Sequence, residues 1–130
     1  MNREYILVIN PGSTSTKVAL FKDGKSVKQK SLSHPNEELE KFEKVTDQYE
    51  YRKTIIMQWL KEEGIELSSI AAVAGRGGLL RSIPGGTYKV TDAMIEDLKV
   101  GIQGEHASNL GGIIAKSIGD AEGIPSFIVD

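Results

Sequence analysis

The first part of the chain alternates between apolar runs and short turn signals, which predicts a three-stranded antiparallel meander. Residues 5–9 form a continuous apolar, partly β-branched run that is typical of a buried strand. A turn signal follows at 10–13, and a second strand is predicted over 15–22. Asp23-Gly24 is a favoured hairpin dipeptide, and residues 26–33 then alternate apolar with polar positions, as an outer strand does.

The middle of the chain has the spacing of helices that pack on this sheet. Apolar residues recur at helical spacing over 39–49 and again over 55–60, and Gly64 is placed to end the second stretch. Thr46-Asp47 leaves open whether this region is one helix or two. The pattern therefore predicts helical structure between the meander and the next strand.

The last part of the chain returns to alternating strands and helices. Residues 70–74 are wholly apolar, which predicts a parallel strand covered on both faces. Helices are predicted over 91–98 and 108–121, the second ending at Gly123, and a last strand over 124–129. The β-β-β-α-β-α-β order predicts an α/β domain, spanning residues 1–130, with a mixed five-stranded sheet and flanking helices.

Composition and charge exclude several classes of function. The chain has no cysteine, so it has neither a disulfide framework nor thiolate chemistry. A formal net charge of −2 argues against a broad nucleic-acid footprint, which requires clustered Lys and Arg. No apolar run approaches the roughly 20 residues that a membrane span requires. We therefore expect a cytoplasmic protein that binds neither nucleic acid nor membrane.

Polar side chains follow three of the predicted strands. Asn10 comes directly after the first strand, Arg76 just after the fourth, and Asp130 closes the fifth. In open α/β sheets, ligands bind outside the carboxyl ends of strands. Any one of these residues is compatible with chance, because polar residues end many strands. The three together, with the glycine loops beside them, predict a binding site at this edge of the sheet.

The stretch at 10–17 (Asn-Pro-Gly-Ser-Thr-Ser-Thr-Lys) has the composition of a phosphate cradle. Gly12 allows close approach of a ligand to the backbone, and backbone N–H groups and hydroxyls are donors for phosphate oxygens. If the strand starts near Ser13, then Ser13, Ser15 and Lys17 share one face at a period of two. The stretch lacks the Gly-Lys-Ser/Thr ending of a P-loop. The alternative reading is a hairpin rich in Ser and Thr with a surface lysine.

Two further residues are candidates for contact with an anion. Arg76 stands between two glycines, and its planar guanidinium suits a carboxylate or a phosphate. His106 precedes a predicted helix, where a histidine is placed to donate a hydrogen bond to an anion. The alternatives are a solvated loop arginine and a capping histidine. Neither histidine has the spacing of a metal site, and His34, next to a proline at a strand end, is predicted to be structural.

Five segments together resemble the acetate and butyrate kinases. The segments are 10–17, 74–78 (Ala-Gly-Arg-Gly-Gly), 84–88 (Pro-Gly-Gly-Thr-Tyr), 105–111 (Glu-His-Ala-Ser-Asn-Leu-Gly) and 127–130 (Phe-Ile-Val-Asp). The last three are more similar to the butyrate kinase branch. The resemblance implies a ribonuclease-H-like (actin-like ATPase) fold and an ATP-dependent phosphotransferase that converts a short-chain fatty acid, butyrate or a branched analogue, into an acyl phosphate with release of ADP. Its cofactor and co-substrate are Mg²⁺ and ATP.

The resemblance also assigns a role to each candidate residue. It implies that Arg76 binds the carboxylate and steadies the transferring phosphoryl group, and that His106 donates a hydrogen bond to that group. Asn10 and Asp130 lie around the metal, with Asp130 also near the attacking carboxylate. The phosphate path is lined by the loop and strand residues Gly12, Ser13, Ser15 and Lys17.

The resemblance places a second, nucleotide-binding domain beyond residue 130. We therefore expect the 130 residues alone to be inactive, and the whole protein to be a homo-oligomer whose partners are a small carboxylic acid and ATP. Two alternatives remain open at this point. One is a sugar-kinase-like or actin-like ATPase domain, and the other is a non-catalytic domain that binds phosphate or a partner protein.

Overall fold

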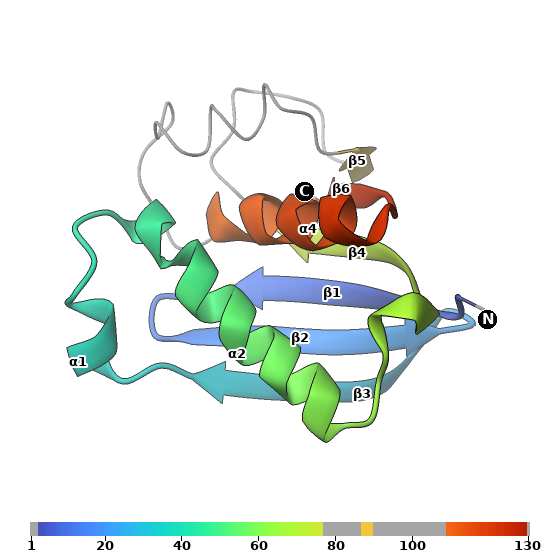
Figure 1. Cartoon of the computed structure of the whole chain (residues 1–130), viewed down its shortest axis with the longest axis horizontal. Helices are drawn as coiled ribbons and strands as arrows, with labels where there is room; N and C mark the ends of the chain where they lie inside the picture. Colours follow the sequence, from blue (N-terminus) through green and yellow to red (C-terminus); the bar gives the residue numbers. More distant parts are fainter. Residues whose placement is uncertain (1–2, 77–86, 90–108, 130) are drawn as a thin grey trace.

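The computed structural model describes residues 3–76, 87–89 and 109–129. Three strands come first, and helices and further strands follow (Figure 1). They are β1 (Tyr5–Pro11), β2 (Ser15–Lys22), β3 (Lys25–Ser33), α1 (Asn36–Leu39), the 3₁₀ helix η1 (Val45–Gln48), α2 (Tyr49–Glu62), the 3₁₀ helix η2 (Leu67–Ser69), β4 (Ile70–Arg76), β5 (Thr87–Lys89), α4 (Leu110–Glu122) and β6 (Ser126–Val129).

The strands form one mixed sheet in the order β3-β2-β1-β4-β6-β5. β1, β2 and β3 pair antiparallel as a meander, whereas β1, β4 and β6 run parallel to one another. The predicted meander, crossovers and five strands are confirmed. The sixth strand, β5, was not predicted because three residues are too few to show a period, and it pairs antiparallel with β6 at the sheet edge.

Left-handed backbone at three turns explains where the elements end. Asp23 and Gly24 have φ values of 52° and 77°, the conformation that a tight two-residue hairpin requires. Gly64, separated from the end of α2 by Glu63, and Gly123, directly after α4, have φ values of 73° and 69°. A glycine reaches this region without steric penalty and so terminates a helix. The predicted hairpin and both predicted helix ends are confirmed.

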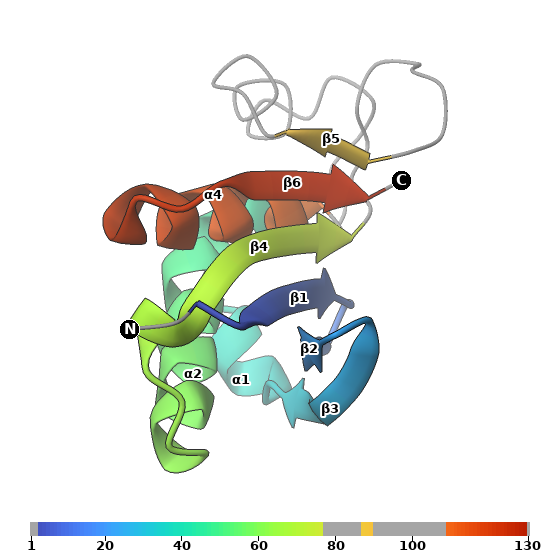
Figure 2. The ribbon, with the colours of Figure 1, turned by 90° about the vertical axis from the view of Figure 1, so that its right-hand side faces the viewer.

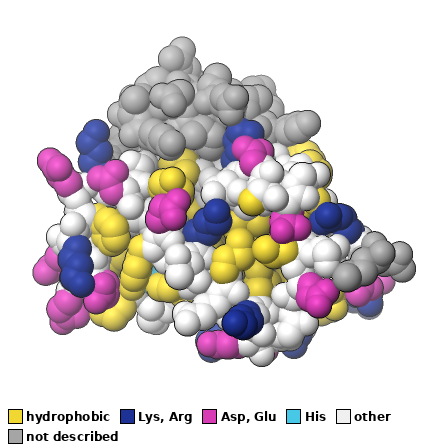
Figure 3. All heavy atoms as spheres, viewed as in Figure 1, with side chains coloured by type: hydrophobic (Ala, Val, Ile, Leu, Met, Phe, Trp, Pro, Cys, Tyr) yellow, Lys and Arg dark blue, Asp and Glu magenta, His cyan; other side chains and the backbone are white. Residues whose placement is uncertain are grey.

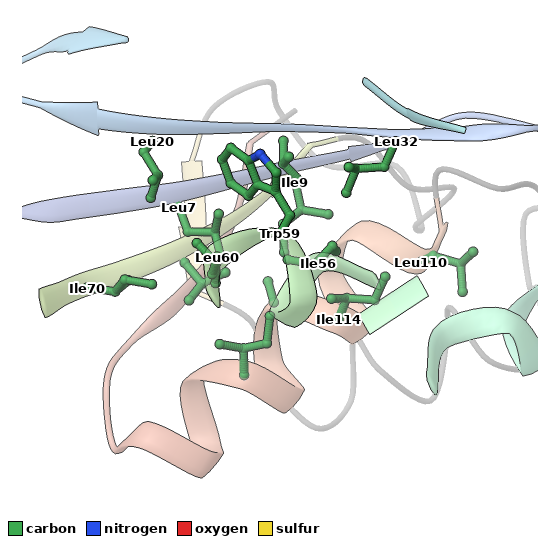
Figure 4. Close-up of a cluster of buried hydrophobic side chains, with 14 of the residues drawn as sticks. Leu7, Ile9, Leu20, Leu32, Ile56, Trp59, Leu60, Ile70, Leu110 and Ile114 are labelled. Carbon is green, nitrogen blue, oxygen red and sulfur yellow. The ribbon is translucent and has the colours of Figure 1, made fainter. Parts of the chain in front are cut away.

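Helices α2 and α4 cover one face of the sheet (Figures 1 and 2). Between them and the strands lies a core of buried aliphatic side chains around Trp59 (Figure 4). Residues of α2 such as Ile56 and Leu60 meet Leu7 and Ile9 of β1, while α4 contributes its own apolar face. Each such side chain contributes roughly 1.5–3 kcal/mol when fully buried. This core fixes β1 and β4, whose carboxyl ends carry the candidate site.

The helix predicted over 39–49 is wrong in its middle. Helix α1 ends at Leu39, and the chain becomes helical again only at Val45. Helix α1 buries none of its residues against the sheet. A helix this short is unstable in water without tertiary packing, so the local spacing of apolar residues does not sustain it. The break lies at 40–44 rather than at Thr46-Asp47.

The two remaining helix predictions have different outcomes. The helix predicted over 108–121 is confirmed as α4, but the one over 91–98 lies outside the described residues.

Within the described part of the chain, no helix has both the length and the apolar character needed to cross a membrane. On the helix-covered face, described acidic and basic side chains are interspersed rather than gathered by sign (Figure 3).

Candidate functional site

The loop between β1 and β2 is short and held at both ends. It consists of residues 12–14, because β1 ends at Pro11 and β2 begins at Ser15. The N–H of Gly12 donates to the carbonyl of Ser15 over 2.7 Å, and the N–H of His34 donates to the carbonyl of Thr14 over 2.8 Å. The backbone of this loop is therefore fixed by the strands on either side of it.

Arg52, on α2, lies behind this loop and was not among the predicted site residues. Its side chain is fully buried, with 0% of its surface exposed. Nη1 donates to the carbonyl oxygens of Gly12 (2.7 Å) and Ser15 (3.0 Å), and Nη2 donates to that of Ser13 (3.2 Å). Burial lowers the pKa of the guanidinium. Because its ordinary pKa lies so far above 7, the group remains charged at neutral pH.

A buried polar cluster surrounds the Arg52 guanidinium. Gln48 accepts from Nε (3.1 Å) and Nη2 (2.8 Å) through its Oε1. The Thr16 hydroxyl accepts from Nη1 at 3.2 Å and lies 2.8 Å from Nε2 of His34. The Thr16 hydroxyl thus contacts both Arg52 and His34. The cluster thus joins α2 to β2 and to the residue that follows β3.

His34 is buried and neutral in this cluster. Burial, and then the charge of Arg52, lower its pKa from 6.5 to about 4. Its ring lies 5.4 Å from that of Tyr51 in an edge-to-face arrangement, and its Nδ1 is buried without a hydrogen-bond partner. The prediction that His34 is structural agrees with this position.

An open groove of about 570 Å³ lies over the sheet beside the loop. Asn10 and Lys17 line it as cross-strand partners of β1 and β2, and Arg76 lines it from the end of β4. β1 and β4 run parallel with Ile9 paired to Gly75, so Asn10 and Arg76 are each the next residue along. Figure 2 shows that the carboxyl ends of β1, β4 and β6 lie at this same end of the sheet. The structure thus brings Asn10, Lys17 and Arg76 together, as predicted.

The groove has an unbalanced charge. Three cationic side chains line it, Lys17, Lys30 and Arg76, and none of the lining residues is Asp or Glu. Within the described residues, no ion pair involves any of the three. A concave surface lined by one sign of charge favours ligands of the opposite sign. Lys30 reaches the groove from β3, through the pairing of that strand with β2.

The backbone of α4 approaches β4 closely at this end of the sheet. A Cβ atom on Gly75 would lie 2.3 Å from the carbonyl carbon and oxygen of Gly111. The missing side chain of Gly75 permits that contact, which places the first turn of α4 beside Arg76. Gly75 and Gly111 therefore position the helix start relative to the candidate site.

The other predicted site residues have different outcomes. Ser15 and Lys17 lie on one face of β2, alternating with buried Thr16, as predicted. Ser13 lies in the loop before the strand, so the period of two does not extend to it. Gly12 has no positive φ, and a Cβ there would meet only ordinary contacts at 3.5 Å. His106 and Asp130 lie outside the described residues.

A magnesium ion fits the donors of this site only in part. The described residues contain no group of three or more His, Cys, Asp or Glu side chains able to hold a metal. Mg²⁺ commonly takes one or two protein oxygens together with substrate phosphates and water. The amide oxygen of Asn10, in the groove, is one such oxygen.

Comparison with solved structures identifies the fold. Acetate kinase from Porphyromonas gingivalis superimposes with a TM-score of 0.58 at 19% identity, covering 97% of this chain and 37% of that one. At that level of identity the likeness establishes the fold and nothing more. The domain is ribonuclease-H-like, as the resemblance implied.

Comparison of sequences is more specific. The chain is 56% identical over 125 residues to a probable butyrate kinase from Clostridium botulinum and 54% identical to butyrate kinase 1 from Clostridium acetobutylicum, with 96% of this chain covered in each case. The chain is therefore a homologue of the butyrate kinases over nearly all its length. It spans about a third (35%) of the length of these curated relatives. No family model matches the chain.

Proposed function

We propose that this chain forms part of an ATP-dependent carboxylate kinase that transfers the γ-phosphoryl group of ATP to a short-chain fatty acid, butyrate or a branched analogue. The observation that carries the proposal is the cationic groove shared by Asn10, Lys17 and Arg76, in a chain more than half identical to proteins named butyrate kinase. A carboxylate is already ionised at pH 7 and needs no general base to act as nucleophile.

The residues of the groove suit phosphoryl transfer, which depends on positioning and charge stabilisation. In the proposed reaction a carboxylate oxygen forms a bond to the γ-phosphorus while the bond to the ADP oxygen breaks. Arg76 binds the carboxylate with its planar fork and stabilises charge on the phosphoryl group. Lys17, Ser15 and the donors of the loop at 12–14 hold the phosphates of ATP.

Residues outside the described ranges complete the proposal. His106 donates a hydrogen bond to the transferring group, and Asp130 shares the metal position with Asn10. When bound, Mg²⁺ neutralises charge on the phosphate oxygens. The adenosine part of ATP is proposed to bind in a second domain, so the 130 residues alone are expected to be inactive.

Trapping of the acyl phosphate with hydroxylamine tests this function. The protein is expressed to the stop codon of its reading frame and supplied with Mg-ATP and acetate, propionate, butyrate or isobutyrate. We expect hydroxamate that is greatest with butyrate or isobutyrate, and a loss of at least 100-fold in Arg76→Ala.

Lys28→Ala is the matched control, because Lys28 is an exposed cation of the same sheet that does not line the groove. It should leave the rate unchanged. A folded protein that gives no hydroxamate with any of the acids would overturn the proposed function, and phosphorylation of a sugar would replace it with a sugar-kinase-like activity.

A further inference from the structure

Two carbonyl groups of the loop at 12–14, those of Gly12 and Ser13, point toward one side chain, as does the carbonyl of Ser15 at the start of β2. The oxygens of Gly12, Ser13 and Ser15 all accept from the two terminal nitrogens of Arg52. This guanidinium comes from α2, 37 to 40 residues away along the chain. The inner surface of the loop is thus set by a group that is neither in the loop nor in the groove.

The planarity of the peptide bond determines which groups the loop presents on its outer side. In a trans peptide, the N–H of one residue points away from the carbonyl of the residue before it, and no cis peptide occurs in the described residues. Because the carbonyls of Gly12 and Ser13 face Arg52, the N–H groups of Ser13 and Thr14 point away from it. Two successive amides directed outward are the donors that cradle an anion.

The positive charge of Arg52 also favours an anion on the outer side of the loop. All of its described partners are neutral oxygens, from three carbonyls, the Gln48 amide and the Thr16 hydroxyl. Among the described residues no carboxylate pairs with it. A fully buried arginine without a counter-ion is uncommon, because desolvation of the charge is unfavourable. An anion bound on the other side of the loop would supply the missing negative charge.

We propose that Arg52 is a positioning residue: it holds the loop so that the amides of Ser13 and Thr14 face the phosphates of ATP. This inference rests on the proposed function. It requires the fork of the arginine, because three backbone carbonyls and Gln48 are reached from three separate nitrogens. A lysine presents all of its donors from one atom and cannot reproduce the arrangement.

Kinetics of Arg52→Lys in the protein expressed to its stop codon test the proposal. We expect kcat/KM for Mg-ATP to fall at least 30-fold, while KM for the carboxylate changes less than twofold. Ile56→Ala is the matched control, because Ile56 is equally buried one turn along α2 and is a member of the core cluster. It should lower the urea midpoint while changing KM for Mg-ATP less than threefold.

Amide hydrogen exchange provides a readout that does not depend on kinase activity. In Arg52→Lys, amide exchange in a peptide that covers residues 11–16 should be at least 10-fold faster. Exchange of the β4 amides should be unchanged. If the variant does not fold, Gln48→Met retains the guanidinium but removes the acceptor that orients it, and the same acceleration is expected. If the unaltered protein makes no acyl phosphate, the proposed function fails, and exchange together with Mg-ATP binding still decides the role of Arg52.

Three results would overturn the inference. Full activity in Arg52→Lys would mean that charge alone suffices. An equal loss of Mg-ATP affinity in Ile56→Ala would mean that Arg52 acts only through stability. Unchanged exchange at residues 11–16 would mean that the guanidinium does not hold the loop.

Discussion

Gly75 of β4 and Gly111 of α4 are in direct backbone contact, close enough that a Cβ on Gly75 would lie 2.3 Å from the Gly111 carbonyl carbon. Gly111 is also near the backbone of Arg76, where a Cβ would lie 3.0 Å from the carbonyl oxygen. The strand end that carries Arg76 and the first turn of α4 are therefore packed as one unit. Neither side of this contact has a flexible side chain that can move aside.

Gly75→Ala should strongly destabilise the domain. The added methyl group would have to displace the backbone of α4, and such overpacking destabilises by about 3 kcal/mol or more. Urea unfolding followed by the fluorescence of Trp59, the single tryptophan of the chain and a core residue, measures the effect. A loss below about 1 kcal/mol would show that the two backbones can separate without strain.

Gly12→Ala should separate stability from ligand binding. A methyl group at Gly12 would meet only the carbonyl and hydroxyl oxygens of Ser15, both at 3.5 Å, so the fold accepts it. Loss of backbone freedom in the unfolded chain should stabilise by up to about 1 kcal/mol. If phosphates lie against this loop, KM for Mg-ATP should rise at least 10-fold. An unaltered KM would show that no ligand approaches Gly12.

Acidification should destabilise the domain through His34. Its folded pKa of about 4 lies below the unfolded value of 6.5, so the unfolded chain binds the extra proton first. The contribution is therefore complete above pH 6.5 and is lost as the pH falls toward 4, with a total of about 3 kcal/mol. His34→Gln should remove most of this dependence in urea titrations between pH 7 and 4.5. If the free energy of unfolding has the same pH dependence in both proteins, His34 is not the group responsible for it.

Lys17→Met should weaken the binding of ATP without affecting the fold. Lys17 is exposed on β2 and keeps its apolar stem in the variant, so the free energy of unfolding should change by less than about 0.5 kcal/mol. KM for Mg-ATP should rise about 10-fold or more, because a cation facing the groove is lost. Lys28→Met, outside the groove, is the control. Equal effects of the two substitutions would remove Lys17 from the site.

Much of the fold could be predicted because its signals are local. Asp23-Gly24, Gly64 and Gly123 mark their turns by a conformation that glycine and a few small polar residues adopt. The prediction of a helix over 39–49 was wrong because helical spacing of apolar residues is not sufficient: α1 has no buried residue and ends at Leu39. β5 was missed because three residues carry no periodic signal.

The candidate site was predictable only where a residue ends a strand. Asn10 and Arg76 follow apolar runs, and parallel pairing of β1 with β4 then brings them together. Arg52 was missed because a charged residue in a helix is ordinarily solvated. A signal was present, since Gln48, Arg52 and Ile56 recur every four residues on one buried side of the chain. Contacts between α2 and the loop cannot be read from spacing alone.

The exposed edge of the sheet has a consequence for how copies of the chain meet. β3 is an outermost strand, and all of its side chains are exposed except Leu32. Lys25, Lys28 and Lys30 lie along it. A row of lysines on the outer strand of a sheet repels a second copy that would extend the sheet by hydrogen bonding. Amyloid-like stacking and domain swapping through this edge are thereby disfavoured.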